Sequence, residues 1–228
     1  MKIKILKKGP YEITNDVPLH NDIIVADEAG ISTKWQKGKQ YDVSGSPTYH
    51  VCRCGRSSHK PFCDGTHVHR QFNDEEQPVQ DAMRFYRGEK YDLEDHEQYC
   101  ASLRFCDRAP RAWNAAIFSG RDDNDKIAVQ ECGDCLSGRL VLKDKNGNAV
   151  EPKLPKEIGL VQDIPAGCRG PLAVKGGIEL EGATGTKYKV RNRMTLCRCG
   201  ESSNMPFCDT SHRSCPHMRG SDENEPNE

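Results

Sequence analysis

The chain has 228 residues and a formal net charge of −1; 35% of its residues are hydrophobic and 29% are charged. Its 33 basic and 34 acidic residues balance, which argues against a dedicated nucleic-acid binder because such a protein needs a net basic surface. No stretch is apolar for the length of a membrane span, and the start lacks the apolar run of a secretory signal. We therefore expect a soluble, cytoplasmic protein that binds neither nucleic acid nor membrane.

Cysteine is the unusual residue of this composition, with 12 in the chain. Cytosolic proteins use cysteines for metals or redox chemistry more often than for disulfides. The low apolar fraction leaves modest material for a core, and metal binding would add stability because its free energy becomes folding free energy. The cysteines are therefore predicted to hold metal.

Strand-like patterns open the chain and return near its end. Residues 9–19 (GPYEITNDVPL) and 40–52 (QYDVSGSPTYHVC) alternate apolar and polar side chains between Gly and Pro, which predicts short antiparallel strands. Residues 170–180 (GPLAVKGGIEL) and 187–197 (KYKVRNRMTLC) repeat the pattern. The distance from Gly to Cys is 43 residues in the first copy and 27 in the second, so we place the extra residues in a loop within residues 20–39.

Each pair of strands leads into a cysteine-rich segment, CRCGRSSHKPFCDGTH at 52–67 and CRCGESSNMPFCDTSH at 197–212. Both read C-x-C-x8-C-x3-H, and the identical spacing indicates a duplicated metal site. The candidate ligands are Cys52, Cys54, Cys63 and His67, and then Cys197, Cys199, Cys208 and His212. A proline ahead of each final Cys and His predicts a helix that carries both on one face. Four ligands so close together suit either a tetrahedral zinc ion or a 2Fe–2S cluster.

A different segment separates the two copies. It opens with a polar linker at residues 71–81, after which Asp92 and the acidic residues behind it favour a helix over about residues 93–105. Residues 113–118 and 126–130 are predicted as strands or a short helix, and residues 138–144 as a strand that enters a turn. The acidic tail, residues 218–228, is predicted to be disordered.

This middle segment has a cysteine pattern of its own, C-x5-C…C-x2-C. Its members are Cys100, Cys106, Cys132 and Cys135. An iron–sulfur cluster, a zinc knuckle and four reduced thiols without metal all remain open for this group.

The two repeated segments resemble the CDGSH, or mitoNEET-type, iron–sulfur proteins, whose pattern is C-x-C-x2-[ST]-x3-P-x-C-D-G-[SAT]-H. The first copy fits throughout, whereas the second departs at Thr210, where the pattern has glycine and a side chain could crowd the loop. The resemblance implies one 2Fe–2S cluster in each copy, held by three cysteines and one histidine. It implies that Cys52 and Cys54 bind the inner iron and that Cys63 and His67 bind the outer, more exposed one. The same roles carry over to Cys197, Cys199, Cys208 and His212.

A weaker resemblance covers the middle segment. Residues 132–140 (CGDCLSGRL) are similar to the ending of ferredoxin motifs, with Leu136 where proline is usual. The segment resembles the divergent ferredoxin-like region that accompanies CDGSH repeats in some bacterial proteins. That resemblance implies a further cluster, of the 4Fe–4S or a related type.

These observations predict an α+β, mostly β fold. Two small β-rich CDGSH repeats, at residues 1–70 and 166–217, are expected to pack as an intramolecular pseudo-dimer, with an inserted α/β ferredoxin-like subdomain at residues 71–165. We expect a monomer that is not an enzyme and that exchanges single electrons with a protein redox partner. Storage of clusters, or their transfer to an apo-protein, uses the same residues. A zinc-stabilised interaction module without redox activity is the alternative from another class.

Overall fold

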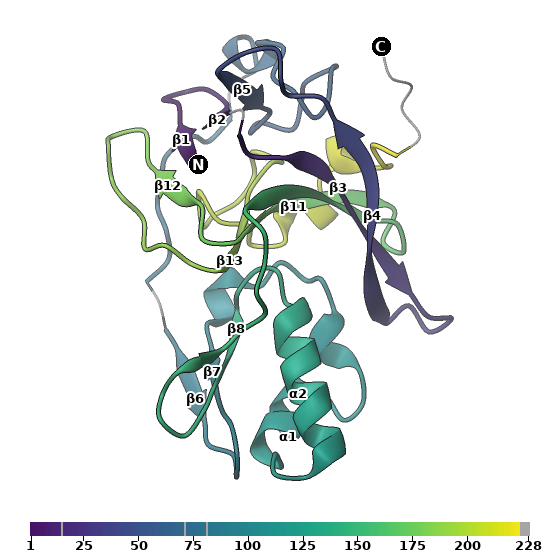
Figure 1. The fold of residues 1–228 in the computed structure, drawn as a ribbon. Helices are drawn as coiled ribbons and strands as arrows, with labels where there is room; N and C mark the ends of the chain where they lie inside the picture. The colour runs from purple at the N-terminus through teal and green to yellow at the C-terminus, as the bar shows by residue number, and fades with distance from the viewer. Residues whose placement is uncertain (15, 71, 81, 224–228) are drawn as a thin grey trace.

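The computed structural model describes all residues except 15, 71, 81 and 224–228. Within that part of the chain, three β-sheets supply most of the regular structure, which confirms an α+β, mostly β fold. Figure 1 shows two sheets, built from both ends of the chain, above a separate body that holds the third sheet and the α-helices. No helix in the described ranges has the length and apolar character needed to cross a membrane.

The first sheet has the strand order β12–β1–β2–β5. Its strands are β1 (Lys2–Ile5), β2 (Tyr11–Thr14), β5 (Thr48–Val51) and β12 (Glu179–Glu181). Alternate side chains point into the core: Ile3, Ile5 and Ile13 are buried, as the period of two in the sequence predicts. Neighbouring strands are antiparallel except for β12, which runs parallel to β1.

The second sheet has the strand order β13–β11–β10–β3–β4. Its strands are β3 (Leu19–Ala26), β4 (Ser32–Tyr41), β10 (Glu157–Asp163), β11 (Cys168–Lys175) and β13 (Arg193–Leu196). Neighbouring strands are antiparallel except for β3, which runs parallel to β10. Every residue of β11 is buried, since the strand lies inside the sheet and is covered on both faces.

The two sheets follow one plan, with an exchange between the copies. The first copy supplies β1, β2, β3 and β5, and the second supplies β10, β11, β12 and β13 in the same roles. The third strand of each copy leaves its own sheet and pairs, in parallel, with the first strand of the other copy. One hydrophobic core joins side chains of both copies, among them Leu19, Leu160 and Leu196. The repeats therefore pack as the expected intramolecular pair.

Two details of the predicted repeats are wrong. The extra residues of the first copy form a hairpin of β3 and β4 rather than a loop. Strand β10 lies in the range assigned to the insertion, yet its hydrogen bonds join it to β3 and β11. The second repeat therefore begins near residue 157 instead of 166. The boundary was misplaced because β10, like β1, precedes the Gly-Pro pair from which the repeat was recognised in the sequence.

The insertion is built around the third sheet, of order β6–β7–β8–β9. Its elements are β6 (Arg84–Tyr86), β7 (Asp92–Asp95), β8 (Leu140–Lys143), β9 (Ala149–Val150), α1 (Ala112–Ile117) and α2 (Asp122–Asp134). The expected strand at 138–144 corresponds to β8, and residues 113–117 and 126–130 are helical. Acidic residues in the first turn of α2 stabilise that helix through its dipole.

The helix predicted over residues 93–105 is wrong. Leu93 lies in β7 opposite Leu142, and the burial of β7 alternates along the strand. Two short 3-10 turns, η2 (Glu97–Tyr99) and η3 (Phe105–Asp107), follow. Cross-strand pairing thus outweighed the helix signal of the acidic residues after Asp92.

The predicted disorder of the tail is wrong for the part that the structure describes. After the turn η5 (Pro216–Met218), Asp222 is only 1% exposed and accepts hydrogen bonds from Arg169 and Arg198. An acidic tail is disordered when it lacks partners, and here buried arginines supply them. Residues 224–228 lie outside the described residues.

Candidate metal centres

Each cysteine-rich loop starts where a core strand ends. Strand β5 runs directly into Cys52, and β13 runs directly into Cys197. The loop then folds back on its own strand, because the N–H of Cys63 donates to the carbonyl of His50 at 2.9 Å. The N–H of Cys208 makes the same contact in the second loop. The β-sheets thus set the position of both ends of each loop.

The first site consists of two donor pairs. The sulfur atoms of Cys52 and Cys54 lie 3.7 Å apart, and Cys63 Sγ lies 3.3 Å from His67 Nδ1. The helix predicted to carry Cys63 and His67 is absent among these described residues. His67 instead lies in a short 3-10 turn, η1 (Thr66–Val68). The tight turn still brings the fourth donor beside the third.

The second site repeats this arrangement. The sulfur atoms of Cys197 and Cys199 lie 3.5 Å apart, and Cys208 Sγ lies 3.3 Å from His212 Nδ1, with a matching 3-10 turn, η4 (Ser211–Arg213). The structure thus brings the eight predicted ligands together as two donor pairs in each loop, and among the described residues no three of them are grouped as ligands of one ion would be. Their binding of metal stays a prediction.

An aspartate braces each loop. The carboxylate of Asp64 accepts hydrogen bonds from the N–H and hydroxyl of Ser58 (2.8 and 2.7 Å) and from the N–H of Thr66 (3.0 Å). Asp209 repeats all three contacts in the second loop. Burial raises the pKa of Asp64, but the hydrogen bonds from Thr66 and Ser58 outweigh it and hold that pKa well below its usual value. The aspartate is therefore charged and fully occupied in shaping the loop.

The inner thiols are prepared for metal binding. The hydrogen bond from Cys54 lowers the pKa of Cys52 to about 6, and that from Cys199 lowers the pKa of Cys197 to about 7, in both cases against the effect of burial. The second thiol of each pair has a raised pKa for the same reason. One thiol of each pair thus deprotonates readily, and the thiolate is the form that binds metal.

An arginine stands between the two inner cysteines of each site. Arg53 and Arg198 are 1% and 4% exposed, and each donates its Nε to a backbone carbonyl, that of Gly9 (3.0 Å) and that of Gly170 (2.6 Å). They anchor the ligand loops to the sheets beneath. We did not predict this role, although the repeated C-R-C triplet carries the signal.

The two ligand loops touch each other at two glycines. A Cβ on Gly55 would lie 3.0 Å from the Cα of Cys199, and a Cβ on Gly200 would lie 3.0 Å from the carbonyl oxygen of Cys54. Both glycines also have positive φ, at +72° and +77°. Glycine is required at each position by conformation and by space. The inner cysteines of the two sites are consequently neighbours.

The outer pairs differ in their access to solvent. Cys63 and His67 are half-buried, whereas Cys208 and His212 are 3% and 2% exposed. The insertion covers the second pair: residues 101, 103 and 105 pack in one apolar cluster with Cys208, and Arg213 donates to the hydroxyl of Ser102 at 2.7 Å. Burial lowers the pKa of His212 to about 4, so its imidazole is neutral at pH 7.

Thr210 occupies the position where the sequence pattern has glycine. Its φ of 79° nearly equals the 83° of Gly65 in the first loop. A Cβ at Gly65 would meet no atom within 4 Å, so the first loop has room there. We therefore attribute the cost of Thr210 to its left-handed backbone, which a β-branched residue rarely adopts, rather than to the crowding expected from the sequence.

Of the four middle cysteines, Cys106 lies in η3 and Cys132 in α2, while Cys100 and Cys135 directly follow η2 and α2. Cys100, Cys106 and Cys135 line one cavity of about 140 Å³, while Cys132 is buried beside it at 1% exposure. In the described part of the chain, no three or more His, Cys, Asp or Glu side chains surround one point as ligands of a single ion would. The third metal site stays a prediction.

Comparison with protein families identifies one match. The family described as "Iron-binding zinc finger CDGSH type" matches residues 8–68 and 169–213. These two regions contain the two ligand loops and the strands that lead into them. Neither the curated proteins nor the solved structures provide a match. Soft thiolates and imidazole suit iron at both loops. The chain therefore carries two copies of a CDGSH-type iron-binding domain.

Proposed function

We propose that the chain holds one 2Fe–2S cluster in each CDGSH loop, through three cysteines and one histidine, and that it transfers single electrons. The observation that carries the proposal is the repeated arrangement of two donor pairs, with donor distances of 3.7 and 3.3 Å in the first loop and 3.5 and 3.3 Å in the second. Two irons with two protein ligands each match two pairs better than one tetrahedral ion does. When bound, such a cluster supplies a one-electron redox couple.

The protein residues would tune that couple. A neutral imidazole in place of a thiolate removes one negative charge from the ligand set, which favours the reduced state. The neutral form of His212 follows from its burial. Buried Arg53 and Arg198 add a positive charge beneath each loop, which acts in the same direction.

We also propose that the chain is a monomeric electron carrier and not an enzyme. The thiols and imidazoles of the two loops are all ligands in this proposal, which leaves none of them as a nucleophile or base. The exchange of strands inside one chain makes the same kind of pair that two single-repeat chains would make. A protein redox partner would meet the first site, whose outer pair reaches the surface.

The first test is an anaerobic purification with an absorption spectrum and counts of iron, sulfide and zinc per chain. We expect a red-brown protein with about four irons and four sulfides, two of each per loop. A colourless protein that contains only zinc, even after reconstitution with iron and sulfide, would overturn the proposal and leave a zinc-stabilised interaction module.

Transfer of clusters to an apo-protein is the second candidate function. The half-buried Cys63 and His67 favour it, because ligands near the surface are open to attack by the thiols of an acceptor. The test mixes the loaded protein with an apo-ferredoxin under anaerobic conditions and follows the acceptor by circular dichroism. Rapid transfer favours this function, and its absence leaves electron transfer.

A third cluster, of the 4Fe–4S type, is proposed for the middle cysteines. Three of the four line one cavity, with Arg139 beside them. An iron count of about eight per chain would support this cluster. Substitution of Cys135 by Ser should then lower the count to about four and leave the two loops loaded.

A further inference from the structure

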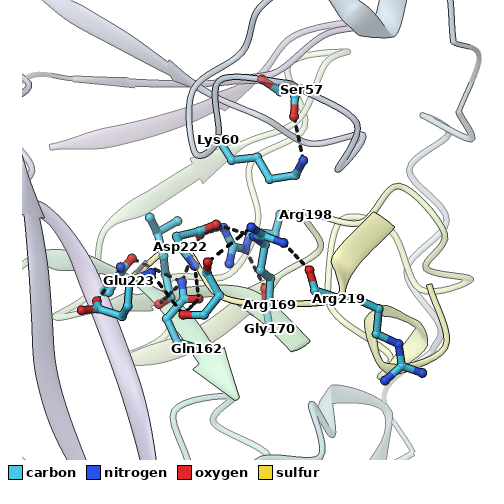
Figure 2. A network of polar contacts seen from close by, with 12 residues as sticks. Ser57, Lys60, Gln162, Arg169, Gly170, Arg198, Arg219, Asp222 and Glu223 are labelled. Atoms are coloured by element: carbon cyan, nitrogen blue, oxygen red, sulfur yellow. Dashed lines mark hydrogen bonds and ion pairs between the residues drawn. The ribbon is translucent and has the colours of Figure 1, made fainter. Parts of the chain in front are cut away.

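The last described residues fold back under the second metal site. Figure 2 shows Asp222 between Arg169 and Arg198, with Gln162 alongside. The Asp222 carboxylate accepts from Arg198 at 2.9 Å and from Gln162 at 3.0 Å, and Arg169 bonds its other oxygen. The backbone N–H of Asp222 donates to the side-chain oxygen of Gln162 at 2.9 Å. Arg169 also donates to the carbonyl of Arg219, so the same network holds the tail backbone.

The network reaches the metal site through Arg198. This residue separates the inner ligands Cys197 and Cys199, and its Nε is fixed to the carbonyl of Gly170. Arg198 is therefore linked to the inner pair by the backbone. Asp222 supplies the opposite charge that this buried guanidinium needs.

The first site has no equally close partner for its arginine. Arg53 lies 3.8 Å from Asp74, and its two terminal nitrogens have no hydrogen-bond partner among the described residues. The ring of Phe72 lies 5.1 Å from that guanidinium. In each copy, an aspartate that follows the ligand loop in the sequence lies near the arginine between the two inner cysteines. Of these two contacts, only the one between Asp222 and Arg198 is a hydrogen bond.

We propose that Asp222 is a positioning residue of the second metal site, and that residues 218–222 form a clasp that retains iron there. The inference rests on the proposed function. The clasp acts through Arg198: with Asp222 bonded, the backbone between Cys197 and Cys199 keeps the geometry of the donor pair. Burial raises the pKa of Asp222, but Arg198 and Arg169 outweigh it and lower that pKa to about 2, so the clasp is charged at neutral pH.

The experiment uses the full chain with one site disabled at a time. Cys63→Ser with His67→Ala leaves only the second site, and Cys208→Ser with His212→Ala leaves only the first. Asp222→Asn, which keeps the shape of the side chain but removes its charge, is placed in both backgrounds. Iron release to a chelator and the reduction potential are measured.

In the background that keeps the second site, we expect Asp222→Asn to speed iron release by about tenfold, the effect of losing a buried hydrogen bond to a charged group. The reduction potential should rise, because the positive charge of Arg198 is no longer compensated. Asp222→Glu should restore part of both properties. In the background that keeps the first site, the effect should be much smaller, although Cys52 and Arg198 border one small cavity.

Glu223→Gln is the matched control, because Glu223 bonds Asn21 at 2.6 Å and the N–H of Lys39 at 3.0 Å and makes no contact with Arg198. It should leave release and potential unchanged. Equal effects of Asp222→Asn in the two backgrounds, or none in either, would overturn the clasp alone. A second-site background that holds no iron even before the tail is changed would overturn the proposed function of that site together with the clasp.

A second variant guards against a failure of Asp222→Asn to fold. Arg169→Gln removes the side chain that holds both the Asp222 carboxylate and the carbonyl of Arg219, so Asp222 is no longer fixed against Arg198. Faster iron release from the second site is the expected result. An unchanged rate would contradict the clasp.

Discussion

In the first metal site the outer donors, Cys63 and His67, are half-buried, whereas in the second site Cys208 and His212 are 3% and 2% exposed. The loops that present these donors are nearly the same, with matching pair distances and the same aspartate brace. What differs is the packing around them. The insertion covers the second outer pair, and the tail binds the second arginine.

The comparison separates the effect of the donors from the effect of the segments packed around them. Donor identity sets what a site can bind, and neighbouring segments set how readily the site exchanges it. We expect the first site to exchange electrons or clusters with partners and the second to retain its own.

The largest effect is expected where the two loops meet. Gly200→Ala would place a Cβ against the Cys54 backbone at a residue with φ of +77°, and should destabilise the protein by about 3 kcal/mol. Denaturant unfolding of the loaded protein measures this. Gly45→Ala is the control, because a Cβ there meets no atom within 4 Å. Equal unfolding midpoints for the two variants would mean that the loops do not depend on each other.

Replacing the proposed histidine ligands by cysteine tests whether the two sites use the same kind of donor. His67→Cys adds a negative charge to the first site and should lower its reduction potential by roughly 100 mV. His212→Cys should do the same at the second site. His59→Ala, at a side chain that is 66% exposed, should change neither potential. A potential that is unaffected by His67→Cys would show that His67 is not a ligand.

Iron release tests the difference in access directly. In the two single-site backgrounds, the first site should lose iron to a chelator about tenfold faster than the second, a ratio that corresponds to 1.4 kcal/mol of barrier. The physical reason is the cover over Cys208 and His212. Release at the same rate would show that burial in the resting structure does not control exchange.

The smallest effect concerns Thr210. Thr210→Gly removes the backbone strain of a β-branched residue with φ of 79°. Glycine also raises the entropy of the unfolded chain, which offsets part of the gain, so we expect a net stabilisation of about 0.5–1 kcal/mol. Gly65→Thr in the first loop should destabilise by about 1 kcal/mol. Thermal unfolding of both variants checks the pair, and a destabilising Thr210→Gly would mean that the side chain makes contacts that outweigh its strain.

Patterns within short stretches of the sequence predicted the features that depend on neighbouring residues. The spacing of Cys52, Cys54, Cys63 and His67 indicated a shared site, and the alternation around Ile13 indicated a strand. The helix expected at Leu93 failed because its partner, Leu142, is distant in the sequence. Asp222 was assigned to a disordered tail because nothing near it in sequence reveals Arg169 and Arg198. Long-range partners decide these cases, and one sequence does not display them.

The exchange of β12 and β3 between the copies has a consequence for biosynthesis. When the ribosome has made the first ligand loop, the edge of β1 that will receive β12 is still unpaired, and it stays so until residue 181 emerges. An unpaired edge strand attracts other chains. The first repeat is therefore a nascent intermediate that needs protection, and its completion waits for the second half of the same chain. Cutting the gene between the repeats would leave two halves that each lack a strand.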